Sequence, residues 1–424
     1  MPRLSLLLAI LTAFWPLQDA ARADFVVSTL DGEPVRGISL SGDASQINLA
    51  TAGGATHRVA TDQVIEIANV PAPPPVAPVS WPFEVELTDG SRLRGVLEAS
   101  AKSDFRLRSP VLDQELELSL DDILAIRRVA GAKIPGAARL VRIPGKDAAY
   151  SLLGQRLEGT VSRLTATGVE MDRGRLKPLE ITYGKLAAVF VDNPPVARPD
   201  ALYLMARLSD GSAVLLTKDF RIAGSTLSGT TPSKLKFKVP IERVVTLGFQ
   251  GGRFVHLSDL TPSKIVREPF FPVPEGPARE IYLDFVAPVR MDASPDGRRI
   301  TLGKRKFFKG IGVRPRTEMT YQLNEAFREF RVLCGVDDEV LGPGYGHGSG
   351  FGSVVFRVLV DGKTVFLSKP QKGGQRPAAV RVPLKGAKTL TLAVDLVPKS
   401  QMPKGRADSP ELDNAVWARP LLVR

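Results

Sequence analysis

The C-terminal part of the chain alternates apolar and polar residues in short runs, which glycine, aspartate and proline separate. Residues 354–360 (VVFRVLV) end at Asp361-Gly362, and a second apolar run follows at 364–367. A run, a two-residue Asp-Gly turn and another run are typical of a β-hairpin. Residues 389–397 (TLTLAVDLV) alternate as a half-buried strand does. With little helical periodicity, the pattern predicts a β-sandwich over residues 254–424.

A second pattern recurs four times before this block. The word G-x-x-Φ-x-G, in which Φ is apolar, occurs in three copies, and a fourth copy keeps only its start; the copies begin at Gly32, Gly90, Gly154 and Gly211. A short apolar run begins 32 or 33 residues after each of these glycines, at Val64, Ile123, Leu186 and Val244. Self-similarity at a fixed period indicates a repeated structural unit.

Each unit reads as four or five short strands with one helical turn before the last strand. The Asp-Gly turn requires a positive φ, and the second glycine of the word permits the sharp bend of a very small barrel. In the repeat at 83–130 we expect Asp122 to cap the helical turn. The units resemble Sm-like small β-barrels in topology only. The predicted fold class is therefore all-β, with four small antiparallel β-barrel-like repeats followed by the sandwich.

Proline-rich stretches suggest the boundaries of these parts. We expect the linkers to be extended spacers that keep neighbouring repeats apart. The predicted parts are a signal peptide at 1–23, repeats at 24–70, 83–130, 145–192 and 201–252, linkers at 71–82 and 193–200, and the sandwich at 254–424.

The N-terminal residues have the form of a secretory signal. Arg3 precedes an apolar run at 4–14, and Ala21-Arg22-Ala23 is an A-x-A site, which predicts cleavage after Ala23. No later apolar run approaches the ~20 residues that span a bilayer, so no transmembrane segment is expected. The sequence therefore predicts a secreted or periplasmic protein. Its one cysteine, Cys334, lies in an alternating run and is expected to be a small buried hydrophobe.

The chain is basic, with a formal net charge of +12. A basic exported protein favours acidic polymers, such as sulfated or uronic polysaccharides, or an anionic envelope surface. Simple solubility is the alternative. The export signal argues against nucleic acid as a partner.

The sequence offers no catalytic constellation. None of the three histidines is spaced from another histidine or a cysteine as metal ligands are, and no G-x-S-x-G, H-E-x-x-H, Walker or dinucleotide-binding motif occurs. Pairs of carboxylates do occur, but a glycosidase needs them at a particular separation across a cleft. The sequence therefore favours binding over catalysis.

Sugar recognition needs a flat apolar face and planar polar groups. Two of the candidates carry an open alternative: Trp417 lies in a strand-like run and could belong to the core, and the glycine-rich loop 342–350 could be a solvent excursion. The candidate carbohydrate-binding residues in the sandwich are Arg314, Asp337, Asp338, Tyr345, His347, Asp413 and Trp417.

Several words in the C-terminal part occur together in one order: LSDL, KGIGV, MTYQL, GVDD, SVVFRVLVDG, GAKTLTL and D-N-A-x-W-A. Together they resemble the NPCBM family of carbohydrate-binding modules, which occur on secreted bacterial proteins. The resemblance implies a galactose-binding-like (jelly-roll) β-sandwich and a carbohydrate ligand. It also implies a structural calcium ion, for which Asp337, Asp338 and Asp413 would supply oxygen ligands.

The chain departs from the family pattern at two places. Arg314 stands where the family usually has histidine, and the basic run 398–406 replaces a loop rich in glycine and aspartate. Both changes add positive charge, which leaves two alternatives open: an anionic polysaccharide as the ligand, or a site that has been lost.

We therefore expect a secreted, non-catalytic carbohydrate-binding protein whose barrel repeats serve as a spacer or docking array. Two alternatives stay open. One is a structural or protein-interaction protein of the bacterial envelope, with partners on the barrel repeats and a sandwich that no longer binds sugar. The other is an accessory to a glycoside hydrolase.

Overall fold

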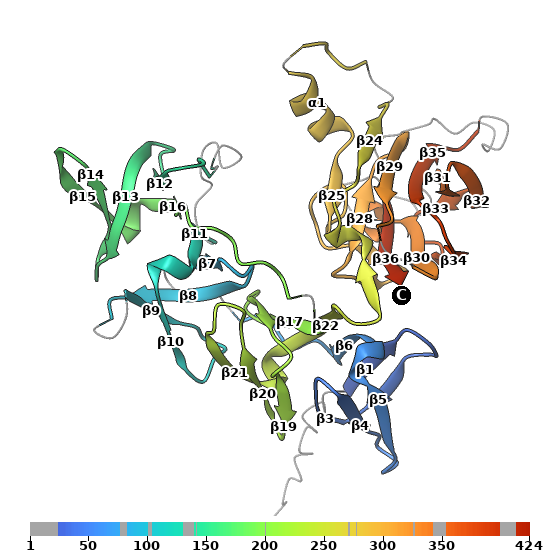
Figure 1. Cartoon of the computed structure of the whole chain (residues 1–424), viewed down its shortest axis with the longest axis horizontal. Helices are drawn as coiled ribbons and strands as arrows, with labels where there is room; N and C mark the ends of the chain where they lie inside the picture. The colour runs from blue at the N-terminus through green and yellow to red at the C-terminus, as the bar shows by residue number, and fades with distance from the viewer. Residues whose placement is uncertain are drawn as a thin grey trace, which may run out of the picture. The chain divides into compact units, whose positions relative to one another are not determined.

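The computed structural model of the chain is all-β, as predicted, and its sheets are antiparallel (Figure 1). It describes residues 24–76, 83–100, 104–129, 140, 142–199, 201–269, 272–276, 278–324, 327–341, 353–398 and 413–424. The chain divides into two compact units, Met1–Phe249 and Gln250–Arg424. No helix in the described ranges is long and apolar enough to cross a membrane.

The four repeats of the first unit share one plan, but repeats 2 and 3 have five strands, within the predicted number, whereas repeats 1 and 4 have six. In repeat 2 a 3-10 turn at Leu120–Asp122 precedes the last strand, and the strands pair in the order last, first, second, third, fourth. The predicted helical turn before the last strand is thus observed in this repeat. The strands of repeat 2 are β7 (Phe83–Leu87), β8 (Arg92–Glu98), β9 (Phe105–Arg108), β10 (Glu115–Leu118) and β11 (Ile123–Arg128).

In the other three repeats, too, the first strand lies next to the last, which follows a 3-10 turn. Repeat 1 contains β1 (Asp24–Thr29), β2 (Val35–Gly37), β3 (Ser39–Asp43), β4 (Gln46–Ala50), β5 (Thr56–Ala60) and β6 (Val64–Val70). Repeat 3 contains β12 (Asp147–Ser151), β13 (Arg156–Leu164), β14 (Gly168–Arg173), β15 (Leu176–Thr182) and β16 (Leu186–Phe190). Repeat 4 contains β17 (Tyr203–Leu208), β18 (Ala213–Leu216), β19 (Arg221–Ala223), β20 (Thr226–Thr230), β21 (Lys236–Pro240) and β22 (Val244–Gln250).

The repeated glycine word accounts for this local structure. The first glycine of every copy has a positive φ, between +78° at Gly154 and +98° at Gly32. At the second glycine a strand of the same repeat approaches closely. A Cβ atom on Gly95 would lie 2.5 Å from the carbonyl oxygen of Arg108, and one on Gly159 would lie 2.3 Å from that of Asp172. The positive φ predicted for the first glycine is confirmed, whereas the second glycine is required by the close approach of a neighbouring strand rather than by the predicted bend.

The expected cap of the helical turn in repeat 2 is wrong. Asp122 lies inside the 3-10 turn, and Ser119 caps it by accepting a hydrogen bond from the N–H of Asp121 (3.3 Å). The side chain of an N-cap residue accepts the N–H of a residue two or three positions further along the chain, as Ser119 does here. Ser119 rather than Asp122 therefore begins the turn.

The repeats are joined by pairing between their strands. Strand β6 of repeat 1 pairs with β22 of repeat 4, β11 of repeat 2 pairs with β16 of repeat 3, and β8 of repeat 2 meets β18 of repeat 4. All four repeats thus contribute to one 16-stranded sheet. The described residues of both linkers, 71–76 and 193–199, contact other repeats rather than holding repeats apart. The N–H of Val76 donates to Ser209 (3.2 Å), and that of Val196 donates to Thr88 (2.8 Å).

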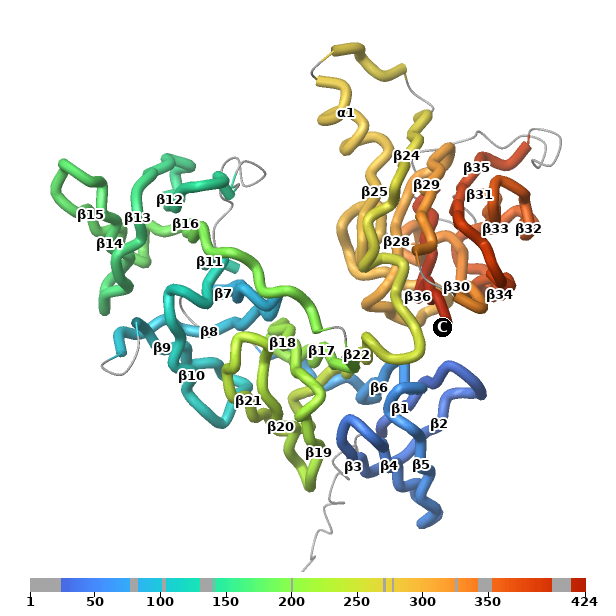
Figure 2. Tube along the Cα trace, in the orientation of Figure 1, coloured from blue at the N-terminus to red at the C-terminus, as the bar shows by residue number. Residues whose placement is uncertain are grey.

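The second unit is a sandwich of two six-stranded sheets, whose path Figure 2 follows. The predicted hairpin is β31–β32, and its turn residues Asp361 and Gly362 both have positive φ. One sheet contains β23 (Phe254–His256), β25 (Val289–Met291), β28 (Gly310–Val313), β30 (Glu329–Val336), β34 (Ala378–Pro383) and β36 (Ala415–Val423). The other contains β24 (Lys264–Arg267), β29 (Thr317–Gln322), β31 (Ser353–Val360), β32 (Lys363–Leu367), β33 (Gln371–Lys372) and β35 (Thr389–Leu396).

The core of the sandwich is aliphatic and aromatic, and it includes Phe330, Phe356 and Trp417. Cys334 is buried in it, as predicted, and burial raises the pKa of its thiol. A smaller cluster lies under a two-stranded hairpin of β26 (Thr301–Leu302) and β27 (Arg305–Lys306). The hairpin is thereby packed onto the outer side of the first sheet.

Candidate ligand-binding pocket

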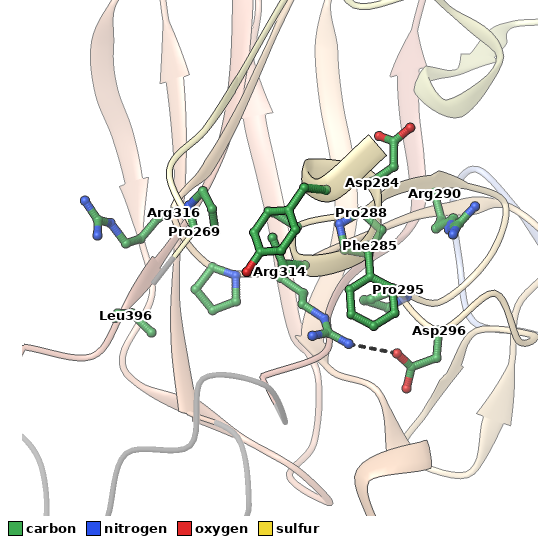
Figure 3. Close-up of a pocket in the computed structure, with 14 residues that line it drawn as sticks. Pro269, Asp284, Phe285, Pro288, Arg290, Pro295, Asp296, Arg314, Arg316 and Leu396 are labelled. Carbon is green, nitrogen blue, oxygen red and sulfur yellow. Dashed lines mark hydrogen bonds and ion pairs between the residues drawn. The ribbon is translucent and has the colours of Figure 1, made fainter. Parts of the chain in front are cut away.

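A pocket of about 470 Å³ lies in the second unit, beside the helix α1 (Arg279–Val286). Figure 3 shows Phe285 from this helix close to Pro295, and Arg314 turned toward Asp296. The pocket lining combines aromatic, proline and charged side chains. These are Tyr282 and Phe285; Pro269, Pro288, Pro295 and Pro315; Asp284, Asp296, Arg290, Arg314 and Arg316; and the aliphatic residues Val286, Ala287 and Leu396.

The helix is held in place from one side only. Leu283 is buried, and Arg267 of β24 pairs with Glu280 and with Asp284 (2.6 Å) on the helix. The aromatic ring of Phe285 is left 80% exposed. A large aromatic side chain that stays exposed beside a pocket offers a flat apolar surface to a ligand.

Arg314 follows the end of β28 and reaches the pocket from the sandwich. Its Nη2 lies 3.0 Å from Oδ1 of Asp296, and both side chains are 20% exposed. The Nε–H of Arg314 is buried and has no hydrogen-bond partner in the described part of the chain. A buried donor without a partner costs about 1–3 kcal/mol.

A polar network extends from this ion pair. The second oxygen of Asp296 accepts a hydrogen bond from Nδ2 of Asn414 (3.0 Å), which also donates to Glu339 (2.9 Å). Burial raises the pKa of Glu339, and the nearby charge of Asp296 raises it further. The network fixes the carboxylate of Asp296, and therefore the orientation of the Arg314 guanidinium.

The pocket helix from Tyr282 onward and the strands β25 to β36 fall within one matched stretch. Residues 282–422 match the family model of the NPCBM/NEW2 domain. This stretch is an NPCBM/NEW2 domain. The resemblance inferred from the sequence words is thus confirmed.

A protein of Renibacterium salmoninarum, named "putative endo-alpha-N-acetylgalactosaminidase", is 32% identical over 103 residues. That match spans 24% of this chain and 6% of the relative. Among solved structures, a CBM51 module of Clostridium perfringens GH95, in complex with methyl-galactose, is 26% identical, with a TM-score of 0.29, covering 40% of this chain and 99% of the module. The tandem CBM51 modules of Streptococcus pneumoniae Sp3GH98 are 14% identical, with a TM-score of 0.29, covering 69% and 90%.

Three of the predicted sugar-binding residues of the NPCBM/NEW2 domain have no surface to offer a ligand, so their prediction is wrong. Trp417 is fully buried, with its ring edge-to-face against Phe356 at 4.8 Å between centroids. Asp413 is buried and accepts the N–H of Ser353 (2.6 Å). Asp337 is buried as well. The alternative that Trp417 belongs to the core is the correct one.

The two consecutive acids Asp337 and Asp338 support the β26–β27 hairpin. Asp337 accepts the N–H of Thr301 (2.9 Å), and burial raises its pKa to about 7. Asp338 accepts the N–H groups of Gly303 (3.2 Å) and Lys304 (2.6 Å). Of the predicted binding residues that are described, Arg314 is the one that lines the pocket. Tyr345 and His347 lie outside the described residues.

The carboxylates expected to hold calcium do not fit a calcium site in the described ranges. There, no group of three or more histidine, cysteine, aspartate or glutamate side chains could hold a metal ion. Asp337, Asp338 and Asp413 instead accept hydrogen bonds from backbone N–H groups. A calcium ion at these residues stays a prediction without support from their contacts.

The sequence analysis missed Tyr282, Phe285 and Asp296. The signal for the first two was present: in REIYLDFV (279–286) Tyr282 and Phe285 are three residues apart, the spacing of neighbours on one helix face. In a chain interpreted as all strands, an eight-residue helix without a capping residue is easily overlooked. Asp296 lies in an irregular segment, and no local pattern distinguishes its carboxylate from the others.

Proposed function

We propose that this protein binds carbohydrate without catalysing a reaction, and that the ligand occupies the pocket of the NPCBM/NEW2 domain beside α1. One observation carries the proposal: the exposed ring of Phe285 and the partly buried guanidinium of Arg314 line the same pocket. A sugar ring presents its C–H face to an aromatic ring and its hydroxyl groups to planar donors and acceptors.

The chemistry of the pocket supports this assignment. The guanidinium of Arg314, which lines the pocket and is 20% exposed, would donate a hydrogen bond to a hydroxyl or ring oxygen of a sugar. Asp296, fixed by Asn414, would accept from a second hydroxyl. The volume of about 470 Å³ lies within the range of roughly 300–1,000 Å³ that is usual for small-molecule sites.

The family supports carbohydrate as the ligand class, and the sequence supports an extracellular or periplasmic location of the protein. An NPCBM/NEW2 domain is a carbohydrate-binding module, and the Renibacterium salmoninarum relative is named as a glycosidase, an enzyme that acts on sugars. Export through the signal peptide at 1–23, which lies outside the described residues, would bring the protein to extracellular glycans.

The matched pair Phe285→Ala and Ile281→Ala tests the proposal. Both side chains are exposed on α1, but only Phe285 lines the pocket. On a glycan array and then by calorimetry, we expect the Phe285 variant to lose about tenfold in affinity and the Ile281 variant to bind as the parent does. Arg314→Lys, which keeps the charge but loses the planar fork, should also weaken binding. If no glycan binds, or if the Phe285 variant binds normally, the proposal is wrong.

A second candidate is protein interaction, as in an envelope component whose domain no longer binds sugar. Ile281 favours it, because this side chain is 76% exposed on α1 outside the pocket. An apolar helix face of this kind is typical of a protein contact. Equal loss of partner capture in the Ile281 and Phe285 variants, with no glycan bound, would support this candidate. An accessory role beside a glycoside hydrolase is compatible with sugar binding and is tested by the same array.

A further inference from the structure

The β26–β27 hairpin carries a concentrated positive charge. We call residues 298–306 the basic hairpin; its cations are Arg298, Arg299, Lys304, Arg305 and Lys306, and all five residues are exposed. No acidic residue occurs between Gly297 and Lys309. The next cation, Lys309, is neutralised by Asp259 and Asp292 (2.7 Å each), whereas no described carboxylate pairs with Lys304 or Lys306.

The basic hairpin is held on a fixed frame. Ile300 and Leu302 are buried beneath it, in one cluster with Val416 and Ala418. At its tip, Gly303 and Lys304 both have positive φ (+56° and +67°), as a two-residue hairpin turn requires. Asp338 accepts the N–H groups of both tip residues, and Asp337 accepts that of Thr301. The cations are thus presented by a rigid turn rather than a loose loop.

Two of the arginines are oriented by aromatic rings. The guanidinium of Arg299 lies 3.4 Å from the ring centroid of Phe308, and that of Arg305 lies 5.1 Å from that of Phe307. A guanidinium stacked on an aromatic ring has its plane fixed by that ring. Planar forks of this kind match the geometry of carboxylate and sulfate groups.

We propose that the basic hairpin is a binding surface for an acidic glycan, that is, a segment of a sulfated or uronic polysaccharide. This inference rests on the proposed function, because it extends the sugar pocket. Pro295 and Asp296 line that pocket, and the chain continues from them directly to Arg298. One polymer chain can therefore place a sugar ring in the pocket and acidic groups on the basic hairpin.

The side chains of the segment favour a polymer in water over a lipid surface. Phe307 is buried, and no large apolar side chain is exposed between residues 297 and 309. A peripheral membrane surface combines basic residues with exposed apolar groups that enter the lipid boundary. The basic hairpin supplies charge and oriented hydrogen-bond donors, but no such group.

The experiment compares two triple variants of the full-length protein. One is Lys304→Gln/Arg305→Gln/Lys306→Gln on the basic hairpin. The control, Lys363→Gln/Lys369→Gln/Lys385→Gln, removes the same charge from exposed positions of the same domain. The probes are heparin, polygalacturonate, neutral dextran and phosphatidylglycerol vesicles. At ~0.1 M salt we expect the basic hairpin variant to bind an acidic glycan about tenfold more weakly than the parent protein, and the difference to vanish at ~1 M salt.

Each outcome decides the inference. Weakened binding of heparin or polygalacturonate in the basic hairpin variant alone, at an unchanged Tm, supports it. Equal losses in both triple variants overturn it, because only net charge would then matter. Binding that is confined to vesicles, or unchanged in the basic hairpin variant, also overturns it. The Phe285→Ala variant separates the two proposals. If Phe285→Ala binds heparin normally and no neutral glycan binds the parent protein, the pocket proposal fails and the basic hairpin proposal is retained. If Phe285→Ala abolishes glycan binding and the basic hairpin variant binds normally, the basic hairpin proposal fails and the pocket proposal is retained.

Discussion

Acidic residues of the second unit serve as acceptors for its own backbone. Asp337 shows this most clearly: it is fully buried, and its two oxygens accept the N–H groups of Thr301 and Glu339. Burial disfavours the charged carboxylate and raises its pKa to about 7, against the opposing effect of the two hydrogen bonds. Such a group makes the stability of the domain depend on pH.

We predict that this contribution to stability falls as the pH rises. Below about pH 4, Asp337 is protonated in both the folded and the unfolded chain. Between about pH 4 and pH 7 the unfolded chain releases the proton while the folded domain retains it, so unfolding becomes progressively easier; above about pH 7 the effect is constant. A pKa raised by about three units corresponds to at most about 4 kcal/mol.

Denaturant unfolding of the parent protein and of Asp337→Asn, over pH 4–8, measures this effect. The asparagine variant should be less stable at low pH, because its amide replaces one of two acceptors, but it should lack the pH-dependent loss. The gap between the two proteins should therefore narrow as the pH rises. A gap of equal size at pH 4.5 and pH 7.5 would show that Asp337 does not titrate in this range.

Only part of the site could be predicted from residue patterns. Arg314 is predicted both as a planar polar group and as a departure from a family word, and it lines the pocket. Asp413 and Trp417 were assigned to the site because they complete another word, but a word does not tell whether its residues support the fold or meet a ligand. Strand β36, which contains Trp417, lies between β28 and β30 and is buried along nearly its whole length. Burial on both faces depends on neighbours that are distant in sequence.

At the scale of elements, the Asp-Gly-Ser sequences at 89–91 and 210–212 form reciprocal contacts between repeats 2 and 4. Oγ of Ser91 accepts the N–H of Leu215 (3.0 Å), and Oγ of Ser212 accepts the N–H of Arg94 (2.9 Å). Each serine follows an Asp-Gly turn, and each accepts from the residue three positions after the other serine. Because the same position is used in both directions, the contact has local two-fold character.

The aspartates of the same turns repeat this reciprocity. Asp89 accepts the hydroxyl of Ser233 (2.7 Å), and Asp210 accepts the hydroxyl of Ser109 (3.1 Å). Repeats 1 and 3 have Glu33 and Gln155 at the serine position. In the described part of the chain, the Asp-Gly-Ser word thus occurs where two repeats meet through their second strands.

We predict that Ser91→Ala/Ser212→Ala destabilises the first unit by about 2–4 kcal/mol, because two buried backbone N–H groups lose their acceptors. Urea unfolding of the full chain measures the loss. Ser39→Ala, at an exposed position of β3, is the control and should change little. A double variant as stable as this control would mean that water replaces both hydroxyl acceptors at no cost.

The repeats were predictable as elements, but their assembly was not. Glycines that need a positive φ or a close backbone approach leave a fixed mark in the sequence, so the repeated word predicts four copies of one small unit. Which edges then pair depends on surfaces far apart along the chain. The sequence around Ile67 or Leu247 does not predict that β6 and β22 pair at these residues. The linkers illustrate the same limit, since proline-rich composition predicts extension but not the surface against which it lies.

At the scale of the whole molecule, each unit has its own hydrophobic core. The large cluster of the first unit contains Phe105 and no residue beyond Phe249, and that of the sandwich contains Phe356 and no residue before Leu257. Units that bury their apolar surface separately behave as separate cooperative systems. Thermal unfolding of the chain should therefore contain two transitions.

Matched core substitutions assign these transitions. Phe356→Ala removes a fully buried ring from the sandwich and should cost about 3–5 kcal/mol, which lowers the Tm of one transition by many degrees. Phe105→Ala does the same in the first unit and should lower the other. Each variant should leave the Tm of the other unit's transition within about a degree of its value in the parent protein, because no side chain is shared between the two cores. If either substitution moves both transitions together in calorimetry, the two units unfold as one, and effects of substitutions in the pocket beside α1 would then have to be separated from the stability of the repeats.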